Sequence, residues 1–188
     1  NQNRVHIFDK RQRQDKKTTV DLTSDLPWDT WTGAGNTKGN RLLLSFASRK
    51  HPSLVWFEPE SGHSQPVSGE INKTVESASC VQRLVDGRWA VGTRFSGVYI
   101  FTDEGEVIRR ILPGQSGLTL TDPNVRALYN MHDRYLWVSF NGGLIAVDLG
   151  RSGLSYFDKS SGVIGSAFQT VVRHQGQLFT GTSRGLFK

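Results

Sequence analysis

Short apolar runs, separated by turns rich in glycine, aspartate and asparagine, dominate the pattern of the chain. Typical runs occupy residues 89–93 and 98–101, and each is flanked by polar or glycine-containing segments. Runs of this kind between turn residues are typical of β-strands. No apolar stripe at 3.6-residue spacing runs through the chain, and most segments between turns are too short for a stable helix. The pattern therefore predicts an all-β fold with negligible helix.

One run returns at nearly regular intervals. Its copies occupy residues 40–46, 87–93, 134–140 and 176–182, and the first copy is the weakest. Successive copies begin 47, 47 and 42 residues apart. A period of this length is typical of four-stranded β-propeller blades. Each blade has two apolar faces that neighbouring blades must cover, so the repeats are expected to fold together.

Each repeat contains four candidate strands that would pair as an antiparallel meander. The innermost strands are expected at residues 29–32, 79–85, 125–130 and 168–172. We predict one propeller segment of about four blades, a partial or small ring, with a partial blade at 1–26, blades at 27–70, 76–113 and 123–159, and a partial blade at 166–188. Trp56, Trp89 and Trp137 occupy repeat positions and are expected in the core.

The strand pattern starts and stops within a blade. An open arc would expose two apolar blade faces, so the remaining blades are expected to come from missing chain or from a second copy, as in a homodimer. A closed four-bladed ring, in which the first and last strands share a blade, is the alternative.

The net charge and the composition limit the kinds of binding partner that are expected. The net charge of +6 is partly concentrated in residues 10–17, but no nucleic-acid motif accompanies it, so we expect no nucleic-acid partner. No window of 18 apolar residues exists, and this segment is not expected to contact a membrane. The single cysteine, Cys80, excludes an internal disulfide and is interpreted as a small buried residue. Asn72-Lys73-Thr74 matches the N-glycosylation sequon.

The repeat resembles a known family. Residues 86–93, Asp-Gly-Arg-Trp-Ala-Val-Gly-Thr, followed by Gly-Val-Tyr-Ile-Phe at 97–101, resemble the repeat of the two-component regulator propeller family. Further copies lie at residues 135–148 and 176–187, whereas residues 42–48 lack the tryptophan and the Gly-Thr pair. The resemblance implies a periplasmic sensor region of a bacterial receptor, on the outer side of the inner membrane, which binds a ligand and signals to an output domain elsewhere.

Ligands of propellers usually lie over the central channel, near loops that join second to third strands and one blade to the next. Candidate ligand-binding residues in such loops are Trp28, Arg49, His51, Arg94, Asn141 and Arg184. Guanidinium groups suit carboxylate, sulfate or phosphate, and an aromatic side chain can stack on a sugar ring. The loops therefore predict a small-molecule ligand that is anionic or sugar-like. The alternative is that the arginines cap loop carbonyls or face solvent.

No catalytic motif is recognisable. The five histidines show no zinc-binding spacing, and the chain has no nucleophile elbow, phosphate-binding loop or paired carboxylates. We expect no metal, no cofactor and no enzyme activity in this segment. Two alternatives remain open, a protein-interaction propeller and a lyase of the streptogramin lyase type. The lyase would need a histidine and a glutamate on the channel face, where His51 is the only histidine.

Overall fold

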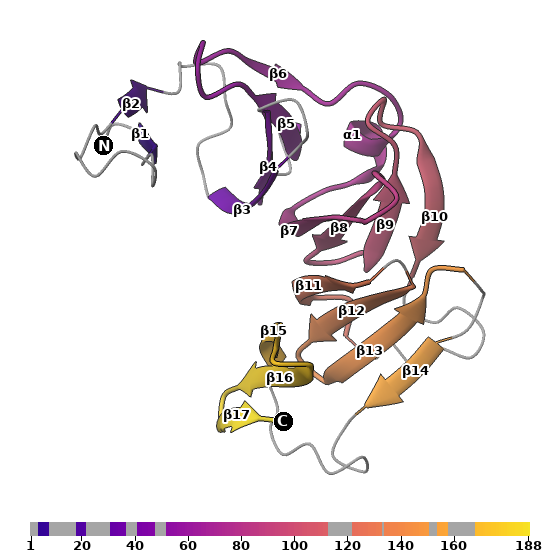
Figure 1. The fold of residues 1–188 in the computed structure, drawn as a ribbon. Helices are drawn as coiled ribbons and strands as arrows, with labels where there is room; N and C mark the ends of the chain where they lie inside the picture. Colours follow the sequence, from indigo (N-terminus) through magenta and orange to yellow (C-terminus); the bar gives the residue numbers. More distant parts are fainter. Residues whose placement is uncertain are drawn as a thin grey trace.

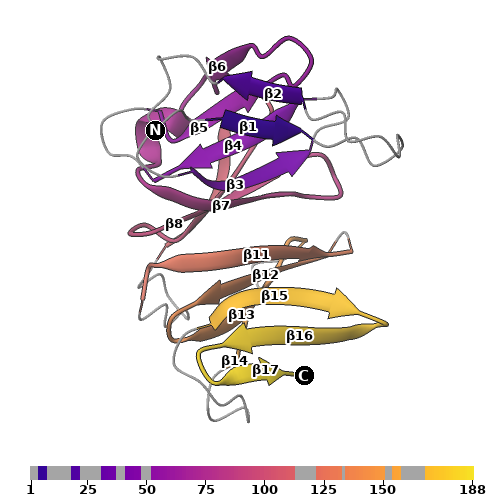
Figure 2. The same cartoon turned by 90° about the vertical axis from the view of Figure 1, so that its left-hand side faces the viewer.

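The computed structural model describes residues 4–7, 18–21, 31–36, 41–47, 52–112, 122–132, 134–150, 154–157 and 168–188. Within these residues the chain forms seventeen β-strands in five separate sheets, and the sheets follow one another around an open arc (Figure 1). The first and last sheets lie at the two ends of this arc, and the view turned by 90° also separates them (Figure 2). The predicted fold class, an all-β protein of propeller blades, is confirmed.

Each sheet is an antiparallel meander in chain order, and we call the five sheets blades 1 to 5. Blade 1 has β1 (Arg4–Ile7) and β2 (Thr18–Asp21); blade 2 has β3 (Trp31–Asn36), β4 (Leu42–Phe46), β5 (Leu54–Phe57) and β6 (Ser64–Pro66). Blade 3 has β7 (Ala78–Arg83), β8 (Trp89–Thr93), β9 (Val98–Phe101) and β10 (Val107–Ile111). Blade 4 has β11 (Val125–Met131), β12 (Tyr135–Phe140), β13 (Gly143–Asp148) and β14 (Leu154–Phe157), and blade 5 has β15 (Phe168–His174), β16 (Gln177–Thr182) and β17 (Gly185–Phe187).

The first strands of blades 2 to 5 form the inner side of the arc. β3 packs against β7, β7 against β11, and β11 against β15. One predicted inner strand was placed wrongly: the range 29–32 was expected, but the strand of blade 2 continues to Asn36. Its second half, Gly33-Ala34-Gly35, lacks the large apolar residues that marked the other inner strands.

Successive side chains of a strand point to opposite faces of its sheet. Each central blade therefore contributes apolar side chains to two cores, one on each face. In blade 3, Trp89 and Val91 pack with Leu43 of blade 2. Ala90 lies on the other face and packs with Val138 of blade 4. The apolar faces predicted from the repeat are therefore buried between blades.

The three repeat tryptophans differ in burial. Trp56 and Trp89 are 4% and 0% exposed, and their rings meet edge to face with centroids 5.5 Å apart. Trp137 was expected in the core but is only partly buried, against a small cluster that includes Phe168 and Val171.

A single helical turn, α1 (Ile71–Thr74), fills the outer junction between blades 2 and 3. Ile71 is completely buried, and its N–H donates to the carbonyl of Gly105 over 3.0 Å. The side-chain amide of Asn72 bonds to the N–H and C=O of Leu54 and to the C=O of Val67, at 2.7 to 2.9 Å. The sequon asparagine is thus part of the blade junction. None of the helices in the described ranges is long and apolar enough to cross a membrane.

Cys80 is half-buried and packs against the core between blades 3 and 4. Burial raises the pKa of its thiol to about 12, although hydrogen bonds with Ser79 and Gly92 act in the opposite direction. The thiol is therefore protonated at neutral pH, in accord with the predicted structural role.

Candidate functional site

The Gly-Thr pair of the repeat shapes the loop between second and third strands. In blade 3, a Cβ atom on Gly92 would lie 2.4 Å from Cγ1 of Val125 in blade 4, so only glycine allows this approach of the blades. Thr93 follows, and its hydroxyl donates to the C=O of Gly97 and accepts from the N–H of Ser96, at 3.0 and 2.8 Å. The pair therefore sets both the distance between blades and the conformation of the loop.

Blade 5 repeats this arrangement. The hydroxyl of Thr182 donates to the C=O of Gly185 and accepts from the N–H of Arg184, at 3.3 and 3.1 Å. The loop of blade 5 is one residue shorter, so Arg94 directly follows its threonine whereas Arg184 is the second residue after its own, and both arginines are exposed. None of the described residues forms a hydrogen bond or ion pair with either guanidinium group.

Hydrogen bonds fix the Arg94 loop on its own blade and join blade 3 to blade 4. The N–H of Arg94 donates to the C=O of Ser77 over 3.1 Å, just before β7. The N–H of Gly97 donates to the C=O of Pro123 over 3.3 Å, two residues before β11. The hydroxyl of Ser79 donates to the C=O of Val125 over 2.7 Å. These bonds hold the loop of blade 3 beside the start of the inner strand of blade 4.

Asn141 lies in the corresponding loop of blade 4 and has a definite partner. Its Oδ1 accepts a hydrogen bond of 3.0 Å from Nε of Arg126, a residue near the start of β11. The bond orients the exposed guanidinium of Arg126 and leaves its terminal nitrogens available to a ligand. Arg94, Arg126 and Asn141 therefore gather at the same end of adjacent blades. The remaining predicted site residues, Trp28, Arg49 and His51, lie outside the described residues.

Arg126 was not among the predicted site residues because the sequence pattern did not reveal a β-bulge that recurs in the inner strands. The pairing register shifts at the same place in all four inner strands, between Trp31 and Gly33, Ala78 and Cys80, Val125 and Ala127, and Phe168 and Thr170. The residues at these β-bulges are polar in every case: Thr32, Ser79, Arg126 and Gln169. A bulge re-aims a side chain relative to simple alternation. In the sequence, each bulge is marked by a polar residue directly after the first apolar residue of the inner strand.

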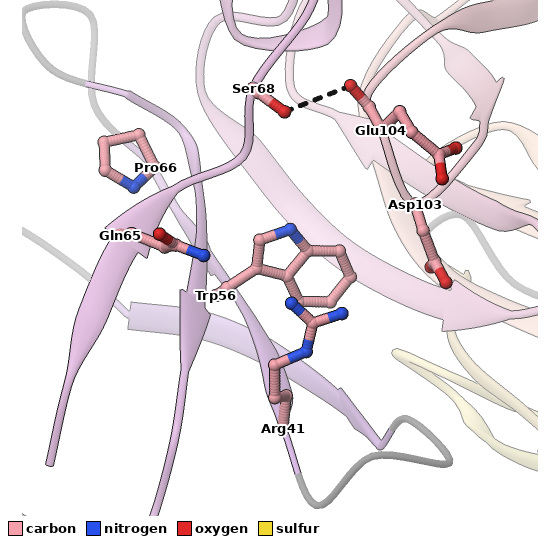
Figure 3. A pocket seen from close by; sticks show the side chains of 7 residues that line it. All are labelled: Arg41, Trp56, Gln65, Pro66, Ser68, Asp103 and Glu104. Atoms are coloured by element: carbon pink, nitrogen blue, oxygen red, sulfur yellow. Dashed lines mark hydrogen bonds between the residues drawn. The ribbon is translucent and has the colours of Figure 1, made fainter. Parts of the chain in front are cut away.

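A cavity of about 360 Å³ lies at the opposite end of the strands, between blades 2 and 3 (Figure 3). Blade 2 and its outgoing connection contribute one wall and the β9–β10 turn of blade 3 contributes the other. The lining residues are Arg41, Trp56, Gln65, Pro66, Ser68, Asp103 and Glu104. Because β9 separates the β8–β9 loop from the β9–β10 turn, this cavity is distinct from the arginine-bearing loops.

Charges of both signs line the cavity. The guanidinium carbon of Arg41 lies 4.9 Å from the ring centroid of Trp56. On the other wall, a carboxylate oxygen of Asp103 accepts from Nε1 of Trp89 over 2.6 Å and lies 3.7 Å from Arg83. In the part of the chain that the structure describes, the carboxylate of Glu104 has no hydrogen-bond or ion-pair partner.

Groups that could support catalysis or metal binding are sparse. No three histidine, cysteine, aspartate or glutamate residues gather in a metal-binding arrangement among the described residues. His132 has a positive φ of 54°, as expected in a tight turn, and its Nε2 accepts a hydrogen bond from Arg173. His51, on which the lyase alternative depended, lies outside the described residues.

Comparisons with known proteins identify the fold. No protein-family model matches the chain, and no curated protein matches it. Among solved structures, the extracellular domain of BT3049 from B. thetaiotaomicron, assigned to the hybrid two-component systems, is 16% identical, has a TM-score of 0.67 and matches 97% of this chain and 27% of its own. The corresponding domain of BT4673 from the same organism is 17% identical, has a TM-score of 0.68 and matches 93% of this chain and 22% of its own.

A third similar structure is the protein YCF48 bound to a D1 peptide. It is 13% identical, has a TM-score of 0.62, and matches 88% of this chain and 51% of its own. The chain spans only about a quarter of the two receptor domains. At these identities the likeness establishes a propeller-type fold.

Proposed function

We propose that the chain belongs to the two-component regulator propellers and forms part of the sensing region of a bacterial receptor, on the outer side of the inner membrane. Two independent features support this proposal. The repeat at residues 86–101 resembles that family, and the similar structures include extracellular domains of two-component systems. The segment would recognise its ligand without transforming it.

The ligand is a small molecule carrying a carboxylate or sulfate, such as an organic acid or an acidic sugar. The observation that carries this assignment is the pair of exposed arginines at one junction, Arg94 from blade 3 and Arg126 from blade 4. Arginine binds carboxylate through two parallel hydrogen bonds, and Asn141 already orients Arg126. Arg184 extends the positive surface toward blade 5.

Contacts from two blades explain how binding could be sensed. A ligand shifts a receptor only if it binds one arrangement of the protein more tightly than another. A ligand held by both Arg94 and Arg126 favours the blade arrangement in which the two groups match its anionic group.

Isothermal titration calorimetry of the 188-residue chain against organic acids and acidic sugars tests the proposal. Arg126→Gln and Arg94→Ala should each weaken binding about tenfold or more, because each removes a charge-assisted hydrogen bond. Arg88→Ala is the matched control, since Arg88 lies in the β7–β8 turn at the other end of the blade and pairs with Asp86. Unchanged affinity in both site variants would contradict the assignment.

A protein-interaction propeller is the second candidate. The observation that favours it is the similar fold of YCF48, whose structure contains a bound peptide. If this function is correct, a protein partner should be recovered with the wild-type chain and lost with variants of exposed loop residues, while the acids give no heat of binding.

We further propose that an additional blade, from more chain or from a second copy, covers blade 5. Val172 and Leu186, which the strand register places on the same face of this blade, are 46% and 68% exposed. Light scattering distinguishes a monomer from a dimer that would supply this cover.

A further inference from the structure

The cavity between blades 2 and 3 has features that the proposed sensing function does not use. It lies at the end of the blades opposite Arg94 and Arg126, and its walls come from two different sheets. Figure 3 shows the side chains of Gln65 and Trp56 on one side and those of Asp103 and Glu104 on the other. A ligand here would bridge two blades.

The charges on the two walls differ in sign. Arg41 lies over Trp56 and carries five N–H donors, and a guanidinium group can bind an anionic group while it keeps its contacts within the protein. Gln65 adds an amide on the same wall. An anion therefore fits best against blade 2.

The facing wall favours a cation. Asp103 is partly compensated by Arg83 and by the indole N–H of Trp89. Glu104 has no such partner within the described residues, and its side chain is exposed at the cavity. The hydroxyl of Ser68 donates to the backbone C=O of Glu104 over 3.3 Å, which ties the connection leaving blade 2 to this turn.

We propose that this cavity binds a small zwitterion with one ammonium and one carboxylate group, the chemistry of a free α-amino acid. The carboxylate pairs with Arg41 on blade 2 and the ammonium with Glu104 on blade 3. The volume of about 360 Å³ lies within the usual range for small-molecule sites. The ligand thus strengthens the junction of blades 2 and 3 in addition to Ile71 and Asn72.

Calorimetry with the twenty L-amino acids tests this inference. At least one should bind the 188-residue chain, and Glu104→Gln and Arg41→Gln should each weaken that binding about tenfold or more. Glu106→Gln is the matched control, because Glu106 lies in the same turn, is exposed and does not line the cavity. Circular dichroism confirms that each variant is folded.

Two additional ligands test the zwitterion requirement. Putrescine carries ammonium groups without carboxylate, and glucose carries hydroxyl groups without charge. The inference predicts that both bind at least about tenfold more weakly than the best amino acid. The inference is overturned if no amino acid binds, if binding survives Glu104→Gln unchanged, or if putrescine or glucose binds as tightly. Arg126→Gln should leave amino-acid binding unchanged, so this test and that of the sensing site can fail separately.

Discussion

Replacing Gly92 by alanine tests how closely the blades are packed. An alanine Cβ at this position would lie 2.4 Å from Cγ1 and 2.9 Å from Cβ of Val125, and 2.7 Å from Sγ of Cys80. These atoms belong to packed strands, so the blades must move apart locally. Overpacking of this kind lowers the free energy of unfolding by about 1–3 kcal/mol. Alanine also reduces the conformational entropy of the unfolded chain, which raises the free energy of unfolding by about 0.4–1 kcal/mol. At the middle of both ranges, the net loss in the free energy of unfolding is about 1.3 kcal/mol.

Urea denaturation followed by tryptophan fluorescence measures this loss as a lower midpoint with an unchanged slope. Gly150→Ala is the matched control, because the nearest atom to its Cβ would be Oδ1 of Asp148 at 3.6 Å, an ordinary contact. A Val125→Ala change combined with Gly92→Ala should cost less than the two single changes added together. The reasoning is refuted if Gly92→Ala unfolds at the wild-type midpoint or if the two changes are additive.

Three further predictions concern other contacts of the repeat. Thr93→Val should lower the free energy of unfolding by about 1–3 kcal/mol, because the buried hydroxyl bonds to Ser96 and Gly97, and calorimetric melting measures the change. Trp89→Phe should cost about 2–4 kcal/mol in urea denaturation, since it removes the bond to Asp103 and leaves a cavity, and a midpoint equal to that of wild type would contradict it. Cys80 should react slowly with a thiol reagent at pH 8 and rapidly in denaturant, and stability should fall above pH 9, because the unfolded thiol ionises there while the folded pKa is about 12.

The fold was largely predictable because the same residue types have the same structural role in successive repeats. The Gly-Thr pair at Gly92 and Thr93 recurs as Gly181 and Thr182, where a Cβ on glycine would again be crowded, at 2.7 Å from Cγ2 of Thr170. Where the pattern lacked such residues, prediction was poorer. The extent of β3 was wrong at its glycine-rich second half, and Trp137 is less buried than expected.

The candidate site was only partly predictable, for two physical reasons. Simple alternation does not account for a bulge, and the exposed Arg126 arises from the bulge between Val125 and Ala127. The cavity between blades 2 and 3 joins Arg41 to Glu104, residues that are far apart in sequence and occupy different positions of the repeat. Such a junction depends on how neighbouring blades pack, and this packing is not visible in a single repeat.

A crystal structure of the chain with its tightest-binding organic acid tests the central claim most directly. The account predicts the carboxylate of the acid between the guanidinium groups of Arg94 and Arg126, with the bond from Arg126 to Asn141 retained. An acid bound elsewhere, with neither arginine in contact, would contradict the assignment of this loop end as the sensing site.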